Sequence, residues 1–463
     1  MAIELDTKTW VEAQFSDCEL GDLRRTKRLK RVATDVANHP AGSFPAQFET
    51  WGDLKAAYRL FDSDGVTFQS IAECHWRRTR DVGPGRYLVL GDTTEIDFGS
   101  QRDVPGLSDI GNGSGNGFLL HNGLLVESES EEILGVAGQT IHYRKPAPKK
   151  ENNAKRLKRE RESRVWGDVI EQIGPPPSAA QFVHVFDRGG DDFEVFCRLR
   201  ENRGDWVIRA KSLNRKIVAP DGERCKFSDY METLPVAGCY DLNLRARPGQ
   251  PARTAHIEVR FGALQMPRPQ HLSTYVKALQ PEPLEMNVVW VRETNPPKGK
   301  KPIEWVLYAT LPVKSFNDAW IVIRYYECRW LIEEYHKALK SGCRVENRQL
   351  HSADRLEAMA GLMSIVAVRL VQLKTMARTE PDRPAKSVVP ELWLQMMKAV
   401  RKNLRRVHDL TIYQFYRELA KLGGFLGRKS DGEPGWITVW RGWEKLNTLI
   451  QGAQHAGKIK KCG

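Results

Sequence analysis

The chain has 463 residues, which is enough for roughly three domains and excludes a single small module. Hydrophobic residues make up 41% of it and charged residues 28%, a composition typical of a folded protein. Lys and Arg number 71 against 58 Asp and Glu, and the resulting charge of +13 favours a polyanionic partner. Nucleic acid fits that charge better than an anionic membrane surface, but charge alone does not separate the two.

No apolar run reaches the ~20 residues that a membrane span requires, because the best candidate, residues 364–373, is interrupted by Arg369. The first twenty residues include Glu4, Asp6, Glu12 and Asp17 and lack the apolar core of a secretory signal. The eight cysteines form no Cys-x-x-Cys pair and no Cys/His spacing that suits zinc. We therefore expect a cytoplasmic protein with free thiols and no membrane partner.

Residues 17–79 have a helical pattern, and a Gly-Pro-Gly turn at 83–85 closes this segment. Within it, residues 24–31 contain six Lys or Arg in eight positions, beside an apolar stripe of Leu29, Val32 and Val36. Such a run is usually the solvated face of a helix. The net charge of the chain raises the alternative of a nucleic-acid contact, as does a second basic run at 145–164.

The middle of the chain has an α/β order of elements. Strand patterns cover residues 86–98, 118–127, 133–143 and 181–186, and a helical pattern follows at 191–200. The glycine-rich stretch 111–117 lacks the Gly-Lys-Ser/Thr ending of a phosphate loop, so we expect a flexible hairpin there. β-patterned runs broken by Pro and Gly predict a β-rich insertion within 206–311. Helical patterns then cover 315–340, 354–378, 393–406, 411–422 and 436–450.

Two acids, Asp92 and Asp187, come at the ends of predicted buried strands, where open α/β sheets place ligands and metals. Each has an ordinary alternative as a turn residue or a helix N-cap. Four polar residues of the predicted helix 315–340 project from one strip about 60° wide at ~100° per residue: Tyr326, Arg329, Glu333 and Lys340. Glu334 falls off this strip, so we expect its alanine variant to retain activity. A salt-bridged solvated face is the common fate of such a strip.

Two Asp and one Glu are hard oxygen ligands, suited to Mg²⁺ or Mn²⁺ and poorly suited to zinc or copper. A pair of such ions can activate water and stabilise a leaving oxygen in phosphodiester chemistry. Arg and Lys beside the carboxylates would hold phosphate oxygens, Arg as a bidentate fork and Lys as a point charge. The acids and the cations together therefore indicate metal-dependent chemistry on DNA.

These residues carry a specific resemblance. Asp92-Thr93-Thr94, Asp187-Arg188 and Tyr326-x2-Arg329-x3-Glu333-x6-Lys340 match the signature of bacterial insertion-sequence DDE transposases with the Tyr-Arg-Glu-Lys motif. The sequence is most similar to the cut-and-paste transposases of the transposon-five type. Further matches are Leu20-Gly21-Asp22, Ala57-Tyr58-Arg59, residues 295–299 (NPPKG), residues 332–338 (IEEYHKA) and Gly423-Gly424-Phe425. The resemblance covers residues 17–443, nearly the whole chain.

The resemblance implies an α/β fold with a ribonuclease-H-like catalytic core, a β-rich insertion, and helical N- and C-terminal domains. The implied domains are residues 1–80 for terminal-repeat DNA binding, 81–345 for catalysis with the insertion at about 212–302, and 346–463 for dimerisation. Asp92, Asp187 and Glu333 would hold two Mg²⁺ per active site, with Mn²⁺ as a substitute. The implied partners are terminal inverted repeats, target DNA and a second copy of the chain in a synaptic complex, in the bacterial cytoplasm.

The resemblance also implies roles in DNA contact. Tyr326, Arg329 and Lys340 match positions that grip phosphates near a hairpin intermediate. Trp305 matches a position that receives a flipped base, although a Trp in such a strand is more often a core residue. The other residues expected to bind DNA are Arg24, Arg25, Lys27, Arg28, Arg209 and Lys211.

The implied activity is Mg²⁺-dependent cleavage through a hairpin, followed by strand transfer into target DNA. The alternative is a transposase-derived regulator that binds DNA without catalysis, and the intact acids argue against it. A ribonuclease-H-like nuclease without strand transfer is a third possibility, but it would not need the Tyr/Arg/Lys strip or the long helical tail.

Overall fold

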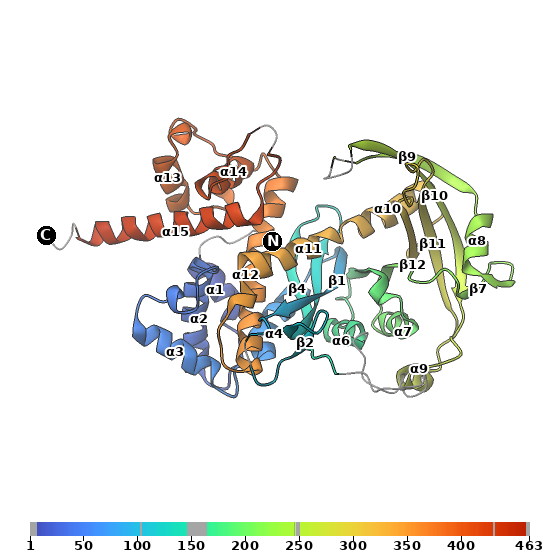
Figure 1. Ribbon diagram of the computed structural model, residues 1–463, viewed down its shortest axis with the longest axis horizontal. Coiled ribbons are helices and arrows are strands. Elements are labelled where there is room, and N and C mark those ends of the chain that lie inside the picture. Colours follow the sequence, from blue (N-terminus) through green and yellow to red (C-terminus); the bar gives the residue numbers. More distant parts are fainter. Residues whose placement is uncertain are drawn as a thin grey trace.

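The computed structural model describes residues 7–101, 104–145, 164–244, 246, 251–428 and 431–459. In these residues, twelve strands form one mixed sheet, and most of the helices gather at one end of it (Figure 1). The four helices before the sheet and the long helix after it share one apolar core with the first strands. The predicted basic run 145–164 lies almost wholly outside the described residues.

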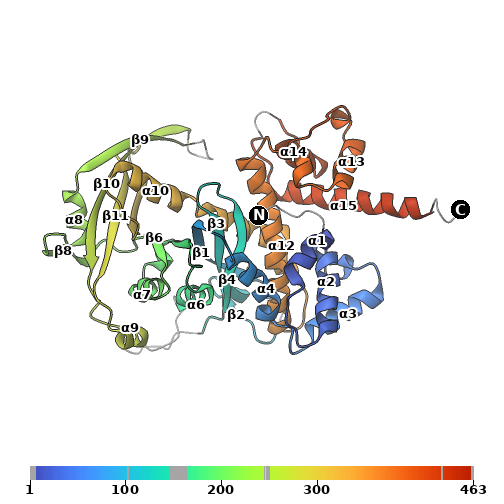
Figure 2. The ribbon, with the colours of Figure 1, turned by 180° about the vertical axis from the view of Figure 1, so that it is seen from behind.

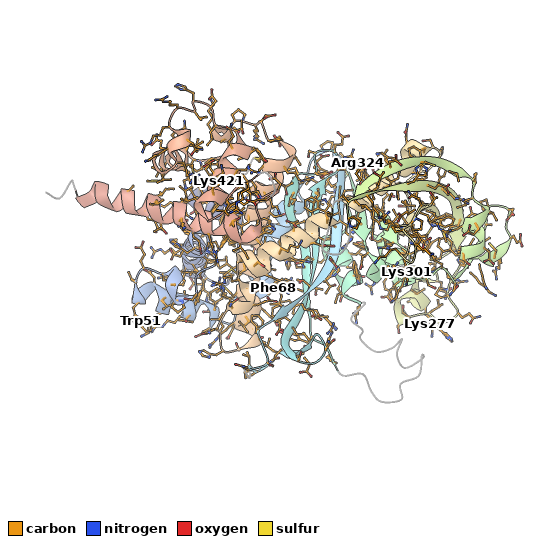
Figure 3. All side chains as sticks on the ribbon, turned by 45° about the horizontal axis from the view of Figure 1, so that its top comes forward. Trp51, Phe68, Lys277, Lys301, Arg324 and Lys421 are labelled. Atoms are coloured by element: carbon orange, nitrogen blue, oxygen red, sulfur yellow. The ribbon has the colours of Figure 1, made fainter. Side chains whose placement is uncertain are left out.

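The N-terminal helices confirm the predicted helical segment; they are α1 (Thr7–Phe15), α2 (Leu23–Asn38), α3 (Trp51–Phe61) and α4 (Phe68–Arg80). Side-chain caps set three of their starts: Asp22 accepts from the Arg24 amide, Thr50 accepts from the Asp53 amide, and Thr67 and Ser70 form a capping box. Phe68 is buried beside the long helix, whereas Trp51 is 73% exposed on an outer face of the molecule (Figure 3).

The first half of the sheet follows the predicted strands closely. It contains β1 (Gly85–Asp97), β2 (Ser108–Ile110), β3 (Gly115–Glu127), β4 (Ile133–His142), β5 (Ala180–Phe186) and β6 (Asp205–Arg209). The spatial order is β4-β3-β1-β5-β6, antiparallel on one side of β1 and parallel on the other. The glycine-rich stretch joins β2 to β3 as a hairpin, as predicted. Helix α6 (Arg164–Ile173) packs against β3 and β4, and α7 (Phe193–Glu201) packs against α6 and β6.

The predicted β-rich segment continues the same sheet. Its elements are β7 (Lys216–Val218), β8 (Arg224–Lys226), α8 (Phe227–Thr233), β9 (Val236–Leu244), β10 (Arg253–Met266), α9 (Thr274–Leu279), β11 (Leu284–Glu293) and β12 (Glu304–Ala309). β12 pairs with β6, so the inserted strands extend the first half of the sheet and do not form a separate one. Figure 2 shows them curving away from the N-terminal helices.

The predicted continuous helix 315–340 is wrong in detail, because it divides into α10 (Phe316–Glu327) and α11 (Trp330–Lys337), followed by a π-helical turn over Ala338–Gly342. At the junction, the amides of Arg329 and Leu331 bond to carbonyls three residues back, a tighter winding than an α-helix. No proline or glycine signals this change in the sequence.

The C-terminal helices are α12 (Ala353–Thr379), α13 (Glu391–Val400), α14 (Ile412–Leu422) and α15 (Trp436–Ile459). α12 is long and apolar enough to cross a membrane, but 94% of its most apolar window is buried within the protein. α13 ends before the predicted boundary at 406, and a 3-10 turn follows it. α15 runs beyond the predicted end at 450 and projects from the body of the molecule (Figures 1 and 2).

Candidate active site

Asp92 and Asp187 lie side by side at one edge of the parallel part of the sheet. β1 and β5 pair in parallel with Gly91 opposite Phe186, so the two acids occupy the next level of the sheet. Asp187 follows the last residue of β5, as predicted, but the predicted strand end at Asp92 is wrong, because β1 continues to Asp97 through its pairing with β3. Asp187 also caps the short turn that follows β5, with its Oδ1 accepting from the Gly189 amide at 2.7 Å. The N-cap interpretation of Asp187 is therefore correct, and it is compatible with a position beside Asp92.

Glu333 reaches this pair from α11, and Arg329 lies between the acids. One guanidinium nitrogen of Arg329 is 3.3 Å from Asp92 Oδ2, and the other is 2.6 Å from Glu333 Oε1. The Asp92 side chain is 22% exposed and that of Glu333 is 48% exposed. Residues separated by more than 230 positions thus meet around one cation.

Asp92, Asp187 and Glu333 place three negative charges close together. The pKa of Asp92 is raised to about 6, because burial and, to a smaller extent, the charges of Asp187 and Glu333 outweigh the lowering effect of Arg329 and of the Thr93 amide. The same acids hold the pKa of Arg329 above its ordinary value although burial alone would lower it. Three carboxylates close enough to repel one another form a site that a cation stabilises.

The donor set suits a hard divalent cation such as Mg²⁺, because it offers carboxylate oxygens and neither thiolate nor imidazole. Within the described residues, however, no three His, Cys, Asp or Glu side chains stand close enough together to hold a metal ion in this conformation. Arg329 explains this, because its guanidinium occupies the space between Asp92 and Glu333. The residues fit the ion by chemistry, and binding would require Arg329 to release at least one carboxylate.

Tyr326 and Trp305 meet beside this cluster. Trp305 is half-buried on β12, and its ring centroid is 5.1 Å from that of Tyr326 in an edge-on contact. Tyr326 is buried, and its interaction with Arg329 is one of those that raise the pKa of Arg329. Lys340 is held elsewhere, because its Nζ donates to the Glu95 carbonyl at 2.9 Å and pairs with Glu346 at 2.9 Å. The predicted strip is therefore divided between two groups.

Arg209 and Lys211 lie near the second acid. β6 pairs with β5 so that Ile208 is opposite Phe186, which places Arg209 at the level of Asp187. The Arg209 side chain donates to the Glu304 carbonyl at 2.9 Å, next to Trp305 in the chain. Lys211 is exposed, and its amide donates to the buried acid Asp191. The sheet therefore carries both basic residues to the same edge as the acids.

The basic helix α2 presents only part of its charge to solvent. Arg24, Lys27 and Arg31 are exposed, and their spacing of three and four residues places them on one face. Arg28 and Lys30 instead form ion pairs with Asp53 and Glu12, and Arg25 donates to the Leu20 carbonyl. Arg24 also pairs with Asp22 at 2.8 Å. The helix is both a core element and a positively charged surface.

A buried polar network under the acids was not anticipated. Asn122 faces Asp92 across the β1–β3 pair and hydrogen-bonds His336, one turn beyond Glu333, at 2.9 Å. Gln139 bonds Asn122 in turn at 2.6 Å. Burial lowers the pKa of His336 to about 3, so the ring is neutral. The position of His336 three residues after Glu333 is the only sequence signal of this network.

Glu334 has hydrogen-bond partners that its position off the predicted strip did not reveal. Its side chain points away from the acids, but it is only 12% exposed and accepts from Lys337, Lys374 and the Trp436 indole. Burial raises the pKa of Glu334, and the hydrogen bonds from Lys374, Lys337 and Trp436 outweigh that effect and hold it below its ordinary value. A helical wheel shows the direction of this side chain and not its partners.

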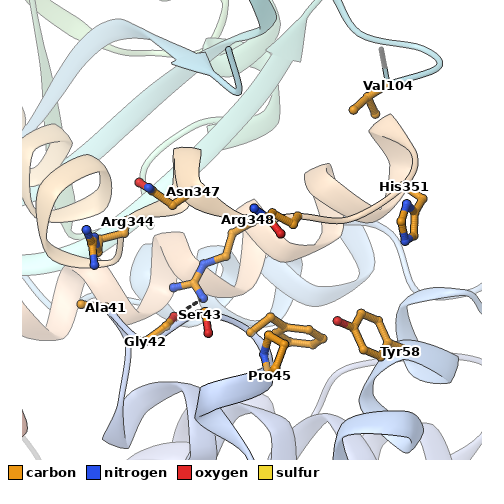
Figure 4. Close-up of a pocket in the computed structure, with 12 residues that line it drawn as sticks. Ala41, Gly42, Ser43, Pro45, Tyr58, Val104, Arg344, Asn347, Arg348 and His351 are labelled. Carbon is orange, nitrogen blue, oxygen red and sulfur yellow. Dashed lines mark hydrogen bonds between the residues drawn. The ribbon is translucent and has the colours of Figure 1, made fainter. Parts of the chain in front are cut away.

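A separate open pocket of about 750 Å³ lies between the N-terminal helices and residues 344–351 (Figure 4). Buried Arg348 joins its two walls, donating to the Gly42 carbonyl at 2.7 Å and to the Cys343 carbonyl at 2.6 Å. Arg344 lies at the rim with a left-handed φ of 50°. This contact fixes the N-terminal helices to the segment of chain that follows α11.

Three family models match the chain in succession. Residues 7–66 match a transposase DNA-binding model, residues 156–369 a transposase DDE domain, and residues 365–463 a transposase Tn5 dimerisation domain. Asp187 and Glu333 fall within the DDE match, whereas Asp92 precedes it. DNA and a second copy of the chain are therefore its partners. With these three domains in one polypeptide and two of the clustered acids inside the central match, the chain belongs to the DDE transposases of the Tn5 type.

Proposed function

We propose that this transposase binds terminal inverted repeats, cuts DNA beside them in a Mg²⁺-dependent reaction that passes through a hairpin, and joins the ends to target DNA. The observation that carries the proposal is the convergence of Asp92, Asp187 and Glu333 around Arg329, at the level of the sheet where β5 ends beside β1. The strand order β4-β3-β1-β5-β6 supports a ribonuclease-H-like core. We place its domains at 1–80, 81–345 and 346–463.

In this proposal, Asp92, Asp187 and Glu333 hold two Mg²⁺, and Mn²⁺ can replace them. When bound, the ions lower the pKa of a coordinated water and stabilise developing charge on the leaving oxygen. Arg329 moves from the carboxylates to a phosphate of the bound strand, for which its planar fork is suited. Tyr326 and Lys340 hold neighbouring phosphates, and Trp305 stacks on a base displaced at the hairpin tip.

The charge of +13 and the exposed face of α2 support binding to the phosphate backbone. Arg24, Lys27 and Arg31 of that face meet DNA, with Arg209 and Lys211 near the cleavage site. Arg25 and Arg28, whose side chains have intramolecular partners, position the helix. Catalysis then takes place in the cytoplasm, on the bacterial nucleoid.

The test uses the inverted repeats that flank the coding sequence, as end-labelled duplexes incubated with the purified protein and Mg²⁺. Nicks and hairpins at the repeat ends, absent in EDTA, are the expected products on a denaturing gel. Repeat-specific binding without any cleavage in Mg²⁺ or Mn²⁺ would instead identify a regulator. Nicking without hairpins or joined products would identify a simple nuclease.

A further inference from the structure

Two adjacent acids on α11 face in different directions. Glu333 points to Asp92 through Arg329, whereas Glu334 points to the C-terminal helices. Glu334 Oε2 accepts from Lys374 Nζ of α12 and, at 2.8 Å, from Trp436 Nε1 at the first residue of α15. The Lys374 ammonium also lies 4.7 Å from the centre of the Trp436 ring. One buried carboxylate therefore joins three helices.

The partners of Glu334 belong to a different part of the protein from Glu334 itself. Glu334 lies in the DDE match, which ends at 369, whereas Lys374 and Trp436 lie in the dimerisation match 365–463. α15, which begins at Trp436, is the helix that projects from the body of the molecule (Figures 1 and 2). The cluster of Glu334, Lys374 and Trp436 is thus a direct link from the dimerisation segment to the helix that carries Glu333.

Of the three partners of Glu334, only Lys374 and Trp436 connect α11 to other helices. Trp436 is 7% exposed and the Lys374 side chain 25%, so both donors to the carboxylate lie largely within the protein. Lys337, its third partner, is 58% exposed and belongs to α11 itself, so it adds no connection between helices. An open pocket of about 480 Å³ borders the cluster between Trp330 and Tyr416. A carboxylate beside open space can change partners without repacking the core.

We propose that Glu334 is a positioning residue for cleavage: through Lys374 and Trp436, it lets the placement of α15 set the position of Glu333 relative to Asp92. This inference rests on the proposed role of Glu333. A shift of α15 on dimer formation would be transmitted through Trp436 to α11 and so to the acidic cluster. The expectation that a Glu334→Ala variant retains activity, which rested on the direction of the side chain alone, is replaced by this proposal.

The experiment compares Glu334→Gln, Lys374→Met and Trp436→Phe, each in the full-length protein. Glu334→Gln keeps the shape and removes the charge, and Trp436→Phe keeps a ring for Lys374 while removing the indole donor. Lys374→Arg is the conservative variant that restores charge. Lys337→Met is the matched control, because it removes an exposed partner of the same carboxylate.

Four measurements separate a positioning role of Glu334 from general damage to the protein. Single-turnover nicking on complexes assembled with terminal repeats gives the rate and its dependence on Mg²⁺, and repeat binding and dimer formation are measured on the same samples. Mn²⁺ binding by electron paramagnetic resonance reports on the acids without requiring turnover. We expect Glu334→Gln and Lys374→Met to slow nicking about 10- to 100-fold and to weaken Mn²⁺ binding about 10-fold. Repeat binding should stay within about twofold, Lys374→Arg should recover most activity, and Lys337→Met should change little.

Wild-type nicking rates and Mn²⁺ affinity in Glu334→Gln and Lys374→Met would overturn the proposal. A loss of nicking that merely follows weaker repeat binding or dimer formation, with Mn²⁺ affinity unchanged, would overturn it as well, because Glu334 would then act in assembly alone. Failure of the proposed function is recognised separately, since the wild-type protein itself would then give no nicks on terminal repeats.

Discussion

Arg329 pairs with Asp92 across 237 positions of sequence, with one guanidinium nitrogen 3.3 Å from Asp92 Oδ2. The same side chain contacts Glu333 at 2.6 Å, so a single cation neutralises two of the three clustered acids. In the absence of metal, Arg329 therefore stabilises an arrangement of carboxylates that would otherwise repel one another. In the proposed function, a metal ion would compete with Arg329 for the same oxygens.

Replacing Arg329 by Gln tests this competition. In EDTA the variant should melt about 2–5 °C below the wild type, because Asp92 and Glu333 lose their compensating charge. Added Mg²⁺ should raise its melting temperature more than it raises that of the wild type, while cleavage falls. Differential scanning calorimetry at several Mg²⁺ concentrations measures both shifts. Equal melting in EDTA would show that Arg329 does not compensate the acids.

Replacing the three acids that are proposed to hold metal should separate cleavage from binding. Asp92→Asn, Asp187→Asn and Glu333→Gln are each expected to abolish nicking while repeat affinity stays near the wild-type value, because the basic surfaces remain. Asp109→Asn, at an exposed acid on β2, is the control that should cleave normally. Labelled repeats resolved on native and denaturing gels give both values. Near wild-type cleavage by any of the three variants would exclude that residue from the site.

The exposed cations of α2 should contribute more to DNA binding than the less exposed cations of that helix that form intramolecular ion pairs. A triple variant with Gln at Arg24, Lys27 and Arg31 is expected to weaken binding and to reduce the salt slope by about 0.9 for each phosphate that the protein no longer neutralises. Lys30→Gln, which removes the partner of Glu12, should have a smaller effect on binding. Fluorescence anisotropy over a series of salt concentrations measures the slopes. An unchanged slope in the triple variant would make α2 an ordinary solvated helix.

Trp305 can be tested against a purely structural role. If it stacks on a displaced base, Trp305→Ala should leave first-strand nicking largely intact and reduce hairpin formation about ten- to a hundredfold, since stacking contributes ~1–3 kcal/mol per base. Trp305→Phe should recover part of the loss because the aromatic face remains. Equal loss of nicking and hairpin formation, with a lower melting temperature, would mean that Trp305 serves only to pack against Tyr326.

Acid should loosen the attachment of the N-terminal helices at His75. Its ring donates to Gln14 and accepts from the Val136 amide, and burial lowers its pKa to about 3, below the ordinary value of 6.5. The unfolded chain therefore binds the additional proton as pH falls below 6.5, so this group's stabilisation is complete above that pH and is lost below it.

This loss amounts to at most about 1.4 kcal/mol per pH unit. The pH dependence of stability should be shallower by one proton in His75→Gln, and unchanged in His271→Gln, an exposed control. Urea unfolding at a series of pH values on both sides of the ordinary histidine pKa measures these slopes. The same slope in the wild type and in His75→Gln would show that His75 does not bear the proton.

Local patterns determined much of the fold. Alternating and continuous apolar runs predicted β1, β3, β4 and β5 within one or two residues at most ends. The reason is that the pattern of apolar side chains along a strand reflects which of its faces are buried. The division of residues 315–340 at Arg329 escaped prediction. Both halves have helical propensity, and only the surrounding contacts select the tighter turn there.

The sequence alone determined the identity of the acids, since Asp92, Asp187 and Glu333 stand in a recognisable pattern with fixed local spacing. The tertiary structure determined which residues lie next to these acids. Parallel pairing of β1 and β5 places the two Asp at one level, and the packing of α11 inserts Arg329 between Asp92 and Glu333. Glu334 is the clearest case, because its partners on other helices, Lys374 and Trp436, lie 40 and 102 positions away. A local pattern specifies which way a side chain points, whereas only the folded chain supplies what it meets there.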